Sequence, residues 1–413
     1  MALGRSPALG FIFVTVVLDV LGVGIIIPIL PELVKELQGL GLGSASYTYG
    51  ILIGLYSLMQ FVFAPILGSL SDQFGRRPVI LISLFGGALD YFLLAWAPTL
   101  AWLFIGRIIS GISGANFSAA SAYIADISPP EKRSANFGIL GAAFGLGFII
   151  GPFLGGKLGV IDPRLPFWVA GCLTLLNWFY GFFVLPESLK LKNRRPFSFA
   201  RANPFGALGE LKKHPLIKGL SLTYFLSSFA HQVYPATWVL YTSYRYGWTP
   251  EQTGNSLGLV GLMSAIVQGG LTRIVIPRIG ERNAAIWGLG IMLLAMIGYA
   301  FATEPWMIYA MIVFGSLSGV ATPALQGVVS KTTADDQQGA IQGAFTSLQS
   351  ITGIFGPPIM TGLFGYFISK NAPFMIPGAA FFFGALLILL AAIVASRTFR
   401  FYGGEEVIRE KQG

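Results

Sequence analysis

Three charged residues lie inside long apolar stretches of this chain: Asp19, Asp90 and Arg107. A charge at membrane depth costs several kcal/mol, so it must face a cavity or a partner. A carboxylate in such surroundings can take up a proton and become neutral, whereas a guanidinium keeps its charge and needs an anion. We therefore predict that Arg107 lies close to the two carboxylates and that the three residues form a proton-coupling site, in which the aspartates bind and release protons and Arg107 supplies the fixed positive charge. The alternatives are an aspartate that only hydrogen-bonds a neighbouring helix and a purely structural ion pair.

A short charged loop between two apolar runs, residues 68–78, is the second candidate site. Gly75 allows a turn with positive φ, and Asp72 could cap the helix that follows. Asp126 ends a later apolar run and is placed to pair with Arg76 or Arg77. The residues that we predict to act as a gate are Gly68, Asp72, Gly75, Arg76, Arg77 and Asp126. The alternative is a plain solvated rim.

A glycine-rich stretch clears one helix face for close packing. Its residues are Gly147, Gly151, Pro152, Gly155 and Gly156. The proline should bend the helix and free a carbonyl. A plain packing face is the alternative here.

Polar and aromatic residues scattered over several apolar runs could bind a ligand. The candidates are Tyr56, Gln60, Asn116, His231, Gln232, Gln268, Gln326 and Gln349. Neutral amides suit an amphipathic ligand better than a proton path. His231 could titrate, although a histidine satisfied by a helix carbonyl is the favoured interpretation.

Composition indicates which elements must position these residues. Of 413 residues, 54% are hydrophobic and 11% charged, with a mean hydropathy of +0.69, whereas soluble domains carry about 25% charged residues. Apolar runs long enough to span a bilayer number 12, approximately 9–31, 47–70, 79–97, 101–125, 135–158, 165–186, 215–241, 252–275, 284–302, 305–330, 338–367 and 374–396. The sequence therefore predicts an all-α integral membrane protein.

The basic residues set the predicted orientation. Loops on one side carry most of the Lys and Arg, so that side and both termini should be cytoplasmic. The predicted organisation is a six-helix half over 1–186, a linker over 187–214, a second six-helix half over 215–396 and a cytoplasmic tail over 397–413. A displacement of 205 residues brings 75–77 onto 280–282, which supports two pseudo-symmetric halves.

Several functions are disfavoured by residues that the sequence lacks. The net charge of +9 comes from basic loops, which does not argue for nucleic acid. Cys172 is the single cysteine, so it can form no intramolecular disulfide. A phosphate-binding loop is missing, which argues against ATP-driven transport. Neither a nucleophile–base set nor a metal cluster stands out, so we expect no enzyme, no metal and no cofactor.

Two motifs resemble those of a known family. The pattern G-x-L-x-D-x-x-G-R-R in residues 68–77 resembles the signature loop of the major facilitator superfamily. Residues 147–156 resemble the antiporter signature G-x-x-x-G-P-x-x-G-G of its drug:proton branch. Within that branch, the chain is most similar to the tetracycline:proton exporter group over nearly its whole length. The resemblance implies a 12-helix transporter fold that works by alternating access.

The resemblance also implies roles for individual residues. The group's intramembrane acids and arginine correspond to Asp19, Asp90 and Arg107, and a glutamine corresponds to Gln268. Pairing between the loop arginines and Asp126 would lock a cytoplasmic gate. Ser264 and Met292 stand where the group has a histidine and an aspartate that serve the proton and the metal–drug complex. Tetracycline is therefore not the expected substrate.

We expect a proton-coupled secondary transporter that exports amphipathic small molecules. A proton-coupled symporter or facilitator of a small metabolite is the first alternative, which the antiporter signature disfavours. A non-transporting receptor or scaffold is the second, which the intact loop and the intramembrane charges disfavour. The expected setting is a monomer that crosses the bacterial inner (plasma) membrane many times, with protons, an amphipathic molecule and the lipid bilayer as partners.

Overall fold

The computed structural model describes residues 7–114, 117–128, 130–197, 209, 211, 215–333 and 338–410. Within these residues the chain is helical and contains no strand. Contacts divide it into two compact units. Unit 1 comprises Met1–Pro204 and Trp248–Gly261, and unit 2 comprises Phe205–Gly247 and Leu262–Gly413.

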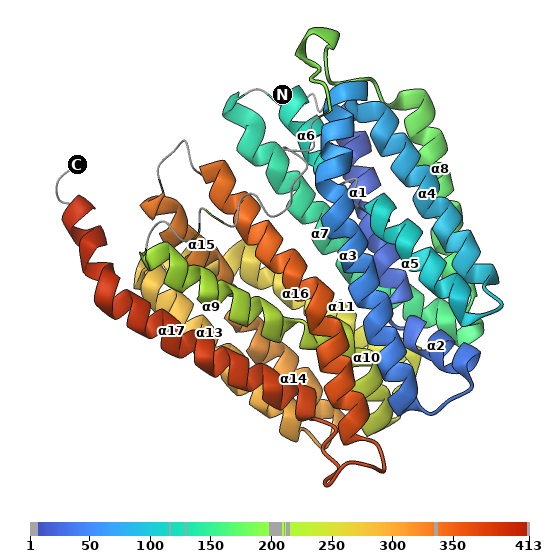
Figure 1. The fold of residues 1–413 in the computed structure, drawn as a ribbon, viewed down its shortest axis with the longest axis vertical. Helices are drawn as coiled ribbons and strands as arrows, with labels where there is room; N and C mark the ends of the chain where they lie inside the picture. Colours follow the sequence, from blue (N-terminus) through green and yellow to red (C-terminus); the bar gives the residue numbers. More distant parts are fainter. Residues whose placement is uncertain are drawn as a thin grey trace. The chain divides into compact units, whose positions relative to one another are not determined.

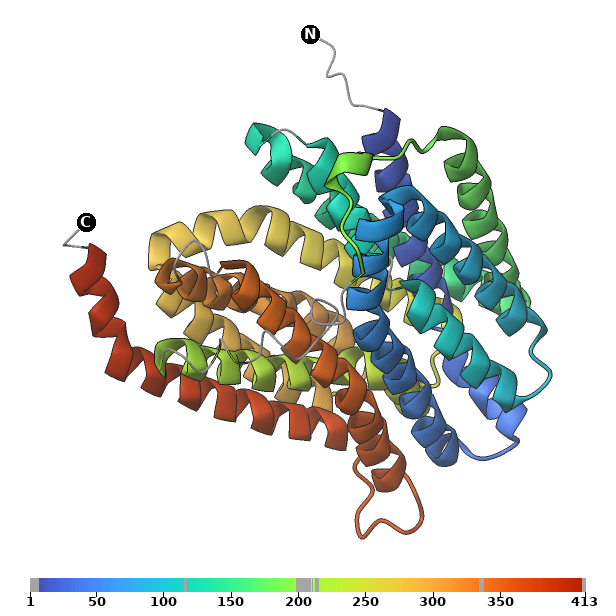
Figure 2. The same ribbon diagram turned by 45° about the horizontal axis from the view of Figure 1, so that its top comes forward.

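Unit 1 is built from the helices of the first half of the chain (Figures 1 and 2). They are α1 (Pro7–Ile26), α2 (Leu30–Gln38), α3 (Leu42–Phe74), α4 (Arg76–Trp96), α5 (Leu100–Gly114), α6 (Phe117–Ile127), α7 (Pro130–Ile161) and α8 (Leu165–Val184), followed by the 3-10 turn η1 (Leu191–Asn193). Most of α11 (Pro250–Ile266) also belongs to this unit.

Unit 2 holds the remaining helices. They are α9 (Pro215–His231), α10 (Val233–Tyr246), the end of α11, the π-helical turn η3 (Val267–Leu271), α12 (Thr272–Ile279), α13 (Glu281–Phe301), α14 (Pro305–Ser316), the 3-10 turn η4 (Leu317–Val320), α15 (Ala321–Thr332), α16 (Gln338–Phe367) and α17 (Ala379–Glu410). Helix α17 runs alongside α9 and α13 (Figure 1).

Ten helical stretches in the described part of the chain are long and apolar enough to cross a membrane. Two of the 12 runs counted in the sequence are not among them. The run 215–241 is divided into α9 and α10 at Gln232, which leaves each piece short. The run 338–367 forms one helix, α16, but it contains Pro357 and Pro358 and many polar residues.

Glycines allow the close packing of α1 on α7 in unit 1. A Cβ on Gly151 would lie 2.8 Å from the carbonyl oxygen of Leu21 and 2.9 Å from Cα of Gly24. On Gly155 it would clash with the backbone of Ile25, one turn further along α1. The apolar core around this pair adds buried side chains of α4 and α6, among them Tyr123. Helix α1, which carries Asp19, is therefore held firmly in its unit.

Candidate functional site

A buried ion pair joins α4 to α5 in unit 1. Arg107 Nη2 lies 3.3 Å from Asp90 Oδ2, and the Asp90 side chain is only 1% exposed. A Cβ on Gly106 would lie 2.7 Å from Asp90 Oδ1, so glycine at this position allows the carboxylate to sit against α5. The ring of Tyr56 on α3 lies 5.9 Å from the Arg107 guanidinium carbon. The pair predicted from the sequence is therefore present at Asp90.

Asp19 lies on α1, half-buried, and belongs to the same constellation. Asp19, Asp90 and Arg107 are all within electrostatic range of the hydroxyls of Tyr56 and Tyr91. The Tyr91 hydroxyl contacts Gly22, which lies about one turn from Asp19 on α1. Sequence reasoning missed Tyr91, and its position directly after Asp90 was the available signal.

Two of the predicted ligand residues lie beside this pair. Gln60 donates from Nε2 to the Tyr56 hydroxyl at 2.9 Å and to the carbonyl of Gly114 at 3.3 Å. Both side chains are half-buried. The hydroxyl of Tyr56 accepts this bond, which leaves its own proton for donation. A third candidate, Asn116, falls outside the described residues.

The predicted ligand residues of unit 2 are more dispersed. Gln232, between α9 and α10, donates to the Thr352 hydroxyl at 3.4 Å, and Gln349 accepts from the Tyr224 hydroxyl at 3.4 Å. Both contacts therefore connect α9 or its end to α16. The exposed His231 has its ring 5.0 Å from that of Tyr234. The two other candidates make neither of these contacts. Gln268 is exposed in the π-helical turn η3, and Gln326 is half-buried on α15.

The charged loop forms a tight corner between α3 and α4, which we call the unit 1 corner (residues 68–78 with Asp126). Gly75 has φ 109°, a conformation that favours glycine. Arg76 is only 8% exposed. Its Nη1 lies 2.6 Å from Asp72 Oδ1 and its Nε lies 3.2 Å from Asp126 Oδ2. The sequence predicts either Arg76 or Arg77 as the partner of Asp126, and the structure shows that the partner is Arg76.

The other corner residues have different partners. Arg77 donates to the carbonyl of Phe182 on α8 at 2.7 Å, and its guanidinium carbon lies 5.8 Å from the Phe182 ring. Gly68 accepts a bond from Ser71 at 2.7 Å. A Cβ on Gly68 would meet nothing closer than 3.8 Å, so the local packing does not require glycine there.

The first turn of α4 is capped by Glu187, and the expectation that Asp72 would cap it is wrong. Glu187 accepts from the backbone N–H of Arg76 at 2.9 Å and from that of Arg77 at 3.3 Å. Asp72 is instead the partner of the Arg76 side chain. A carboxylate at a helix start satisfies unpaired donors and faces the positive end of the helix dipole. The only signal for this cap in the sequence is that Glu187 is an acidic residue directly after the apolar run 165–186.

The segment around Glu187 is bound to the unit 1 corner at further points. Ser188 donates to Asp126 at 3.0 Å, and the Arg195 N–H donates to the Asp72 carbonyl at 3.1 Å. The Tyr123 hydroxyl donates to the carbonyl of Pro186 at 2.9 Å. In Figure 1 this segment is the green loop above α3 and α4. The start of the predicted linker is therefore part of the corner.

The glycine-rich stretch packs α7 against two helices of unit 1. Gly147, Gly151 and Gly155 meet α1, while Gly156 faces α11, where a Cβ would lie 2.5 Å from the carbonyl of Pro250. In turn, Gly254 of α11 lies against the carbonyl of Pro152. Helix α7 continues through Pro152 without ending.

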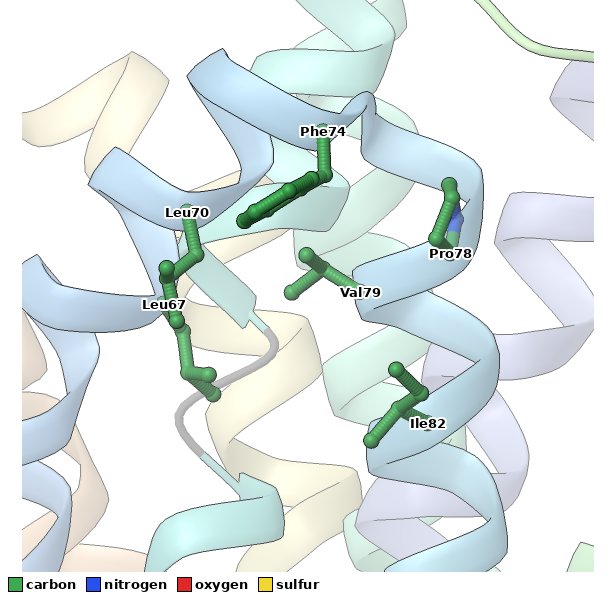
Figure 3. A pocket seen from close by; sticks show the side chains of 6 residues that line it. All are labelled: Leu67, Leu70, Phe74, Pro78, Val79 and Ile82. Atoms are coloured by element: carbon green, nitrogen blue, oxygen red, sulfur yellow. The ribbon is translucent and has the colours of Figure 1, made fainter. Parts of the chain in front are cut away.

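An apolar groove of about 460 Å³ lies between α3 and α4 near the unit 1 corner (Figure 3). It is lined by Leu67, Leu70, Phe74, Pro78, Val79 and Ile82. None of these side chains can bind a proton or an ion. The groove therefore shares no residue with the Asp90–Arg107 pair.

Comparison with known proteins places the chain among transporters. The family model described as Major Facilitator Superfamily matches residues 12–357. Tetracycline resistance protein, class C, of Escherichia coli is 39% identical over 378 residues, covering 91% of this chain and 95% of that protein. The Hippocampus abundant transcript 1 protein of Homo sapiens is 30% identical over 373 residues, covering 84% of this chain and 76% of that protein.

A solved structure agrees with these sequence matches. The human organic anion transporter MFSD10 (TETRAN) superimposes with a TM-score of 0.70 at 26% sequence identity. The match covers 94% of this chain and 99% of that one.

Proposed function

Since the chain belongs to the major facilitator superfamily, we propose that it exports amphipathic small molecules in exchange for protons, by alternating access. The observation that carries this proposal is the buried pair of Asp90 and Arg107. A purely passive carrier has no need for an ionisable pair at this depth, where each charge is costly.

The pair can respond to a proton in a defined way. With Asp90 ionised, the pair is neutral overall and α4 is attracted to α5. A proton on the Asp90 carboxyl removes this attraction and leaves Arg107 with an uncompensated charge. Asp19 on α1 lies within electrostatic range of the same tyrosines. Protonation would therefore shift the balance of forces between three helices of unit 1.

The proposed substrate is an amphipathic organic compound. A relative at 39% identity is a tetracycline resistance protein, and a structural relative is an organic anion transporter. In this chain Ser264 is half-buried on α11, and Met292 on α13 is 8% exposed. Neither can replace the histidine and aspartate expected of a tetracycline exporter. Tyr56 and Gln60, next to Arg107, are the proposed contacts in unit 1, with the amides of unit 2 as further candidates.

We also propose the cellular setting. The chain is a multi-pass integral membrane protein. The bacterial relative favours the plasma membrane of a bacterium, and the basic loops favour cytoplasmic termini. The unit 1 corner then lies at the cytoplasmic surface, where opening of its ion pairs would accompany opening of the gate. We propose that one copy of the chain suffices for transport.

Purified protein in proteoliposomes with an internal pH-sensitive dye tests the proposal. A proton gradient is imposed, and amphipathic cations, organic anions, tetracyclines and sugars are added in turn. We expect an amphipathic compound to move against the proton flux, and its coupling to the proton gradient to be lost in Asp19→Asn and in Asp90→Asn. Flux of protons and compound in the same direction would contradict export and indicate a symporter. Coupling that survives both substitutions would contradict the assigned site.

A further inference from the structure

Unit 2 has an ion pair at its own corner between helices, outside the residues assigned so far. Lys331 Nζ lies 3.2 Å from Glu281 Oε2. Glu281 begins α13 and Lys331 lies in the last turn of α15. The displacement of 205 residues that relates the two halves brings Arg76 onto Glu281 and Asp126 onto Lys331. The same two positions are therefore paired in both units, with the charges exchanged.

The surroundings of the pair repeat as well. Gly280 has φ 79° and turns the chain into α13, as Gly75 turns it into α4. Arg282 lies 5.8 Å from the ring of Phe399 on α17, and Arg77 lies 5.8 Å from the ring of Phe182 on α8. A Cβ on Gly327 would lie 2.8 Å from Glu281 Oε1, so glycine there makes room for the carboxylate. The unit 2 pair is built into its corner rather than formed by chance at the surface.

The exchanged charges suit the helix ends of unit 2. A helix start attracts negative charge and a helix end attracts positive charge. Glu281 and Lys331 both satisfy this preference. In unit 1 the preference is violated twice, because Arg76 begins α4 and Asp126 lies near the end of α6. The unit 2 pair therefore needs no counterpart of Glu187 or Asp72, and Pro277 stands where Asp72 would fall.

We propose that Glu281 and Lys331 are positioning residues that hold the cytoplasmic ends of α13 and α15 together during transport. They are a charge-exchanged counterpart of the Arg76–Asp126 pair and keep unit 2 intact while it moves. This role rests on the proposed transport function. The opposition of the two charges contributes more than their match to the helix ends, because Lys331 is 60% exposed and contacts no second carboxylate within the described structure.

Charge exchange in proteoliposomes tests the proposal. Glu281→Lys and Lys331→Glu should each lower the maximal transport rate about fivefold, since a screened attraction becomes a repulsion. The substrate concentration at half-maximal rate should not change. The double variant with both exchanges should recover to within about twofold of wild type. Lys331→Arg, the conservative control, should behave as wild type.

Two results would overturn the proposal: single reversals that transport at the wild-type rate, or a double variant no better than the worse single one. Thermal unfolding in detergent checks that each variant folds. If a reversal does not fold, Glu281→Gln and Lys331→Gln give the same comparison with a smaller loss. If transport by the wild type were not coupled to protons, the proposed function would be refuted. The transport rates of the single and double variants could still be compared.

Discussion

The two corners share a backbone and differ in their charges. Gly75 and Gly280 both have positive φ, and two residues after each glycine comes an arginine whose guanidinium carbon lies 5.8 Å from a phenylalanine ring. The unit 1 corner buries Arg76 between two carboxylates, whereas the unit 2 corner has one pair, in which the lysine is exposed and the glutamate is half-buried. The two halves thus share the glycine turn and the arginine–phenylalanine contact, but the positive and negative members of the ion pair are exchanged between them.

The difference indicates a different role for each corner. In unit 1, both charges oppose the helix dipoles, and Glu187 offsets this at α4. An arrangement that depends on several partners can be opened when one of them moves. In unit 2, the negative charge of Glu281 lies at a helix start and the positive charge of Lys331 at a helix end. Because both helix dipoles favour these charges, the Glu281–Lys331 pair needs no further partner. We therefore propose that the unit 1 corner opens during transport, whereas the unit 2 corner stays closed.

Removing the cation should affect unit 1 far more than unit 2. Arg76→Ala leaves Asp72 and Asp126 without their guanidinium, and we expect transport to fall on the order of tenfold or more. Lys331→Ala leaves a single carboxylate at a favourable helix end, and we expect a loss of about twofold. Initial rates in inverted membrane vesicles, normalised to protein amount, measure both. Equal losses would contradict the distinction between the corners.

Substitution of Gly75 and of Gly280 tests how tightly each corner is packed around its glycine. Both substitutions to alanine introduce backbone strain, but a Cβ on Gly75 would also lie 2.7 Å from the Glu187 carboxyl carbon, while on Gly280 it would meet nothing within 4 Å. We expect Gly75→Ala to destabilise by about 1–3 kcal/mol more than Gly280→Ala. The unfolding temperatures of the two variants in detergent test this. If Gly280→Ala were the less stable variant, Glu187 would not be packed on the corner as described.

Loss of the Glu187 cap at the start of α4 should have the smallest effect of the changes considered. Glu187→Gln keeps the size of the side chain but removes its charge, and we expect a loss of about 1 kcal/mol in the free energy of unfolding. Glu251→Gln, in the first turn of α11, is a control acid at another helix start. Chemical denaturation in detergent measures both. A Glu187→Gln variant as stable as wild type would show that the N–H groups of α4 need no anion.

The sequence predicted the family, the fold and two ion pairs correctly. Apolar length predicts spans, and the match to the major facilitator superfamily confirms the fold. Asp90 with Arg107, and Asp126 with Arg76, were predictable because a charge among apolar residues requires a counterion. The roles assigned to these residues in proton coupling and gating stay predictions.

Other features depended on contacts that no local pattern reveals. Glu187 is 111 residues from Arg76 in the sequence, so its cap could not be seen from either segment. Local signals were present for two other features: the break at Gln232 comes three residues before Pro235, and the π-helical turn at Val267–Leu271 contains Gly269 and Gly270. The apolar length of these runs nevertheless predicted continuous spans. The Glu281–Lys331 pair was hidden because the exchanged charges no longer match the motif of the first half.

The ratio of protons to substrate moved in proteoliposomes, compared between Asp90→Asn and His231→Asn, is the most direct test of the central claim that proton coupling resides in unit 1. Asp90 forms the buried pair, and His231 is the titratable side chain among the ligand candidates of unit 2. We predict that Asp90→Asn still exchanges substrate across the membrane but loses its response to a proton gradient, while His231→Asn keeps the wild-type ratio. Loss of coupling in His231→Asn, with normal coupling in Asp90→Asn, would contradict the account.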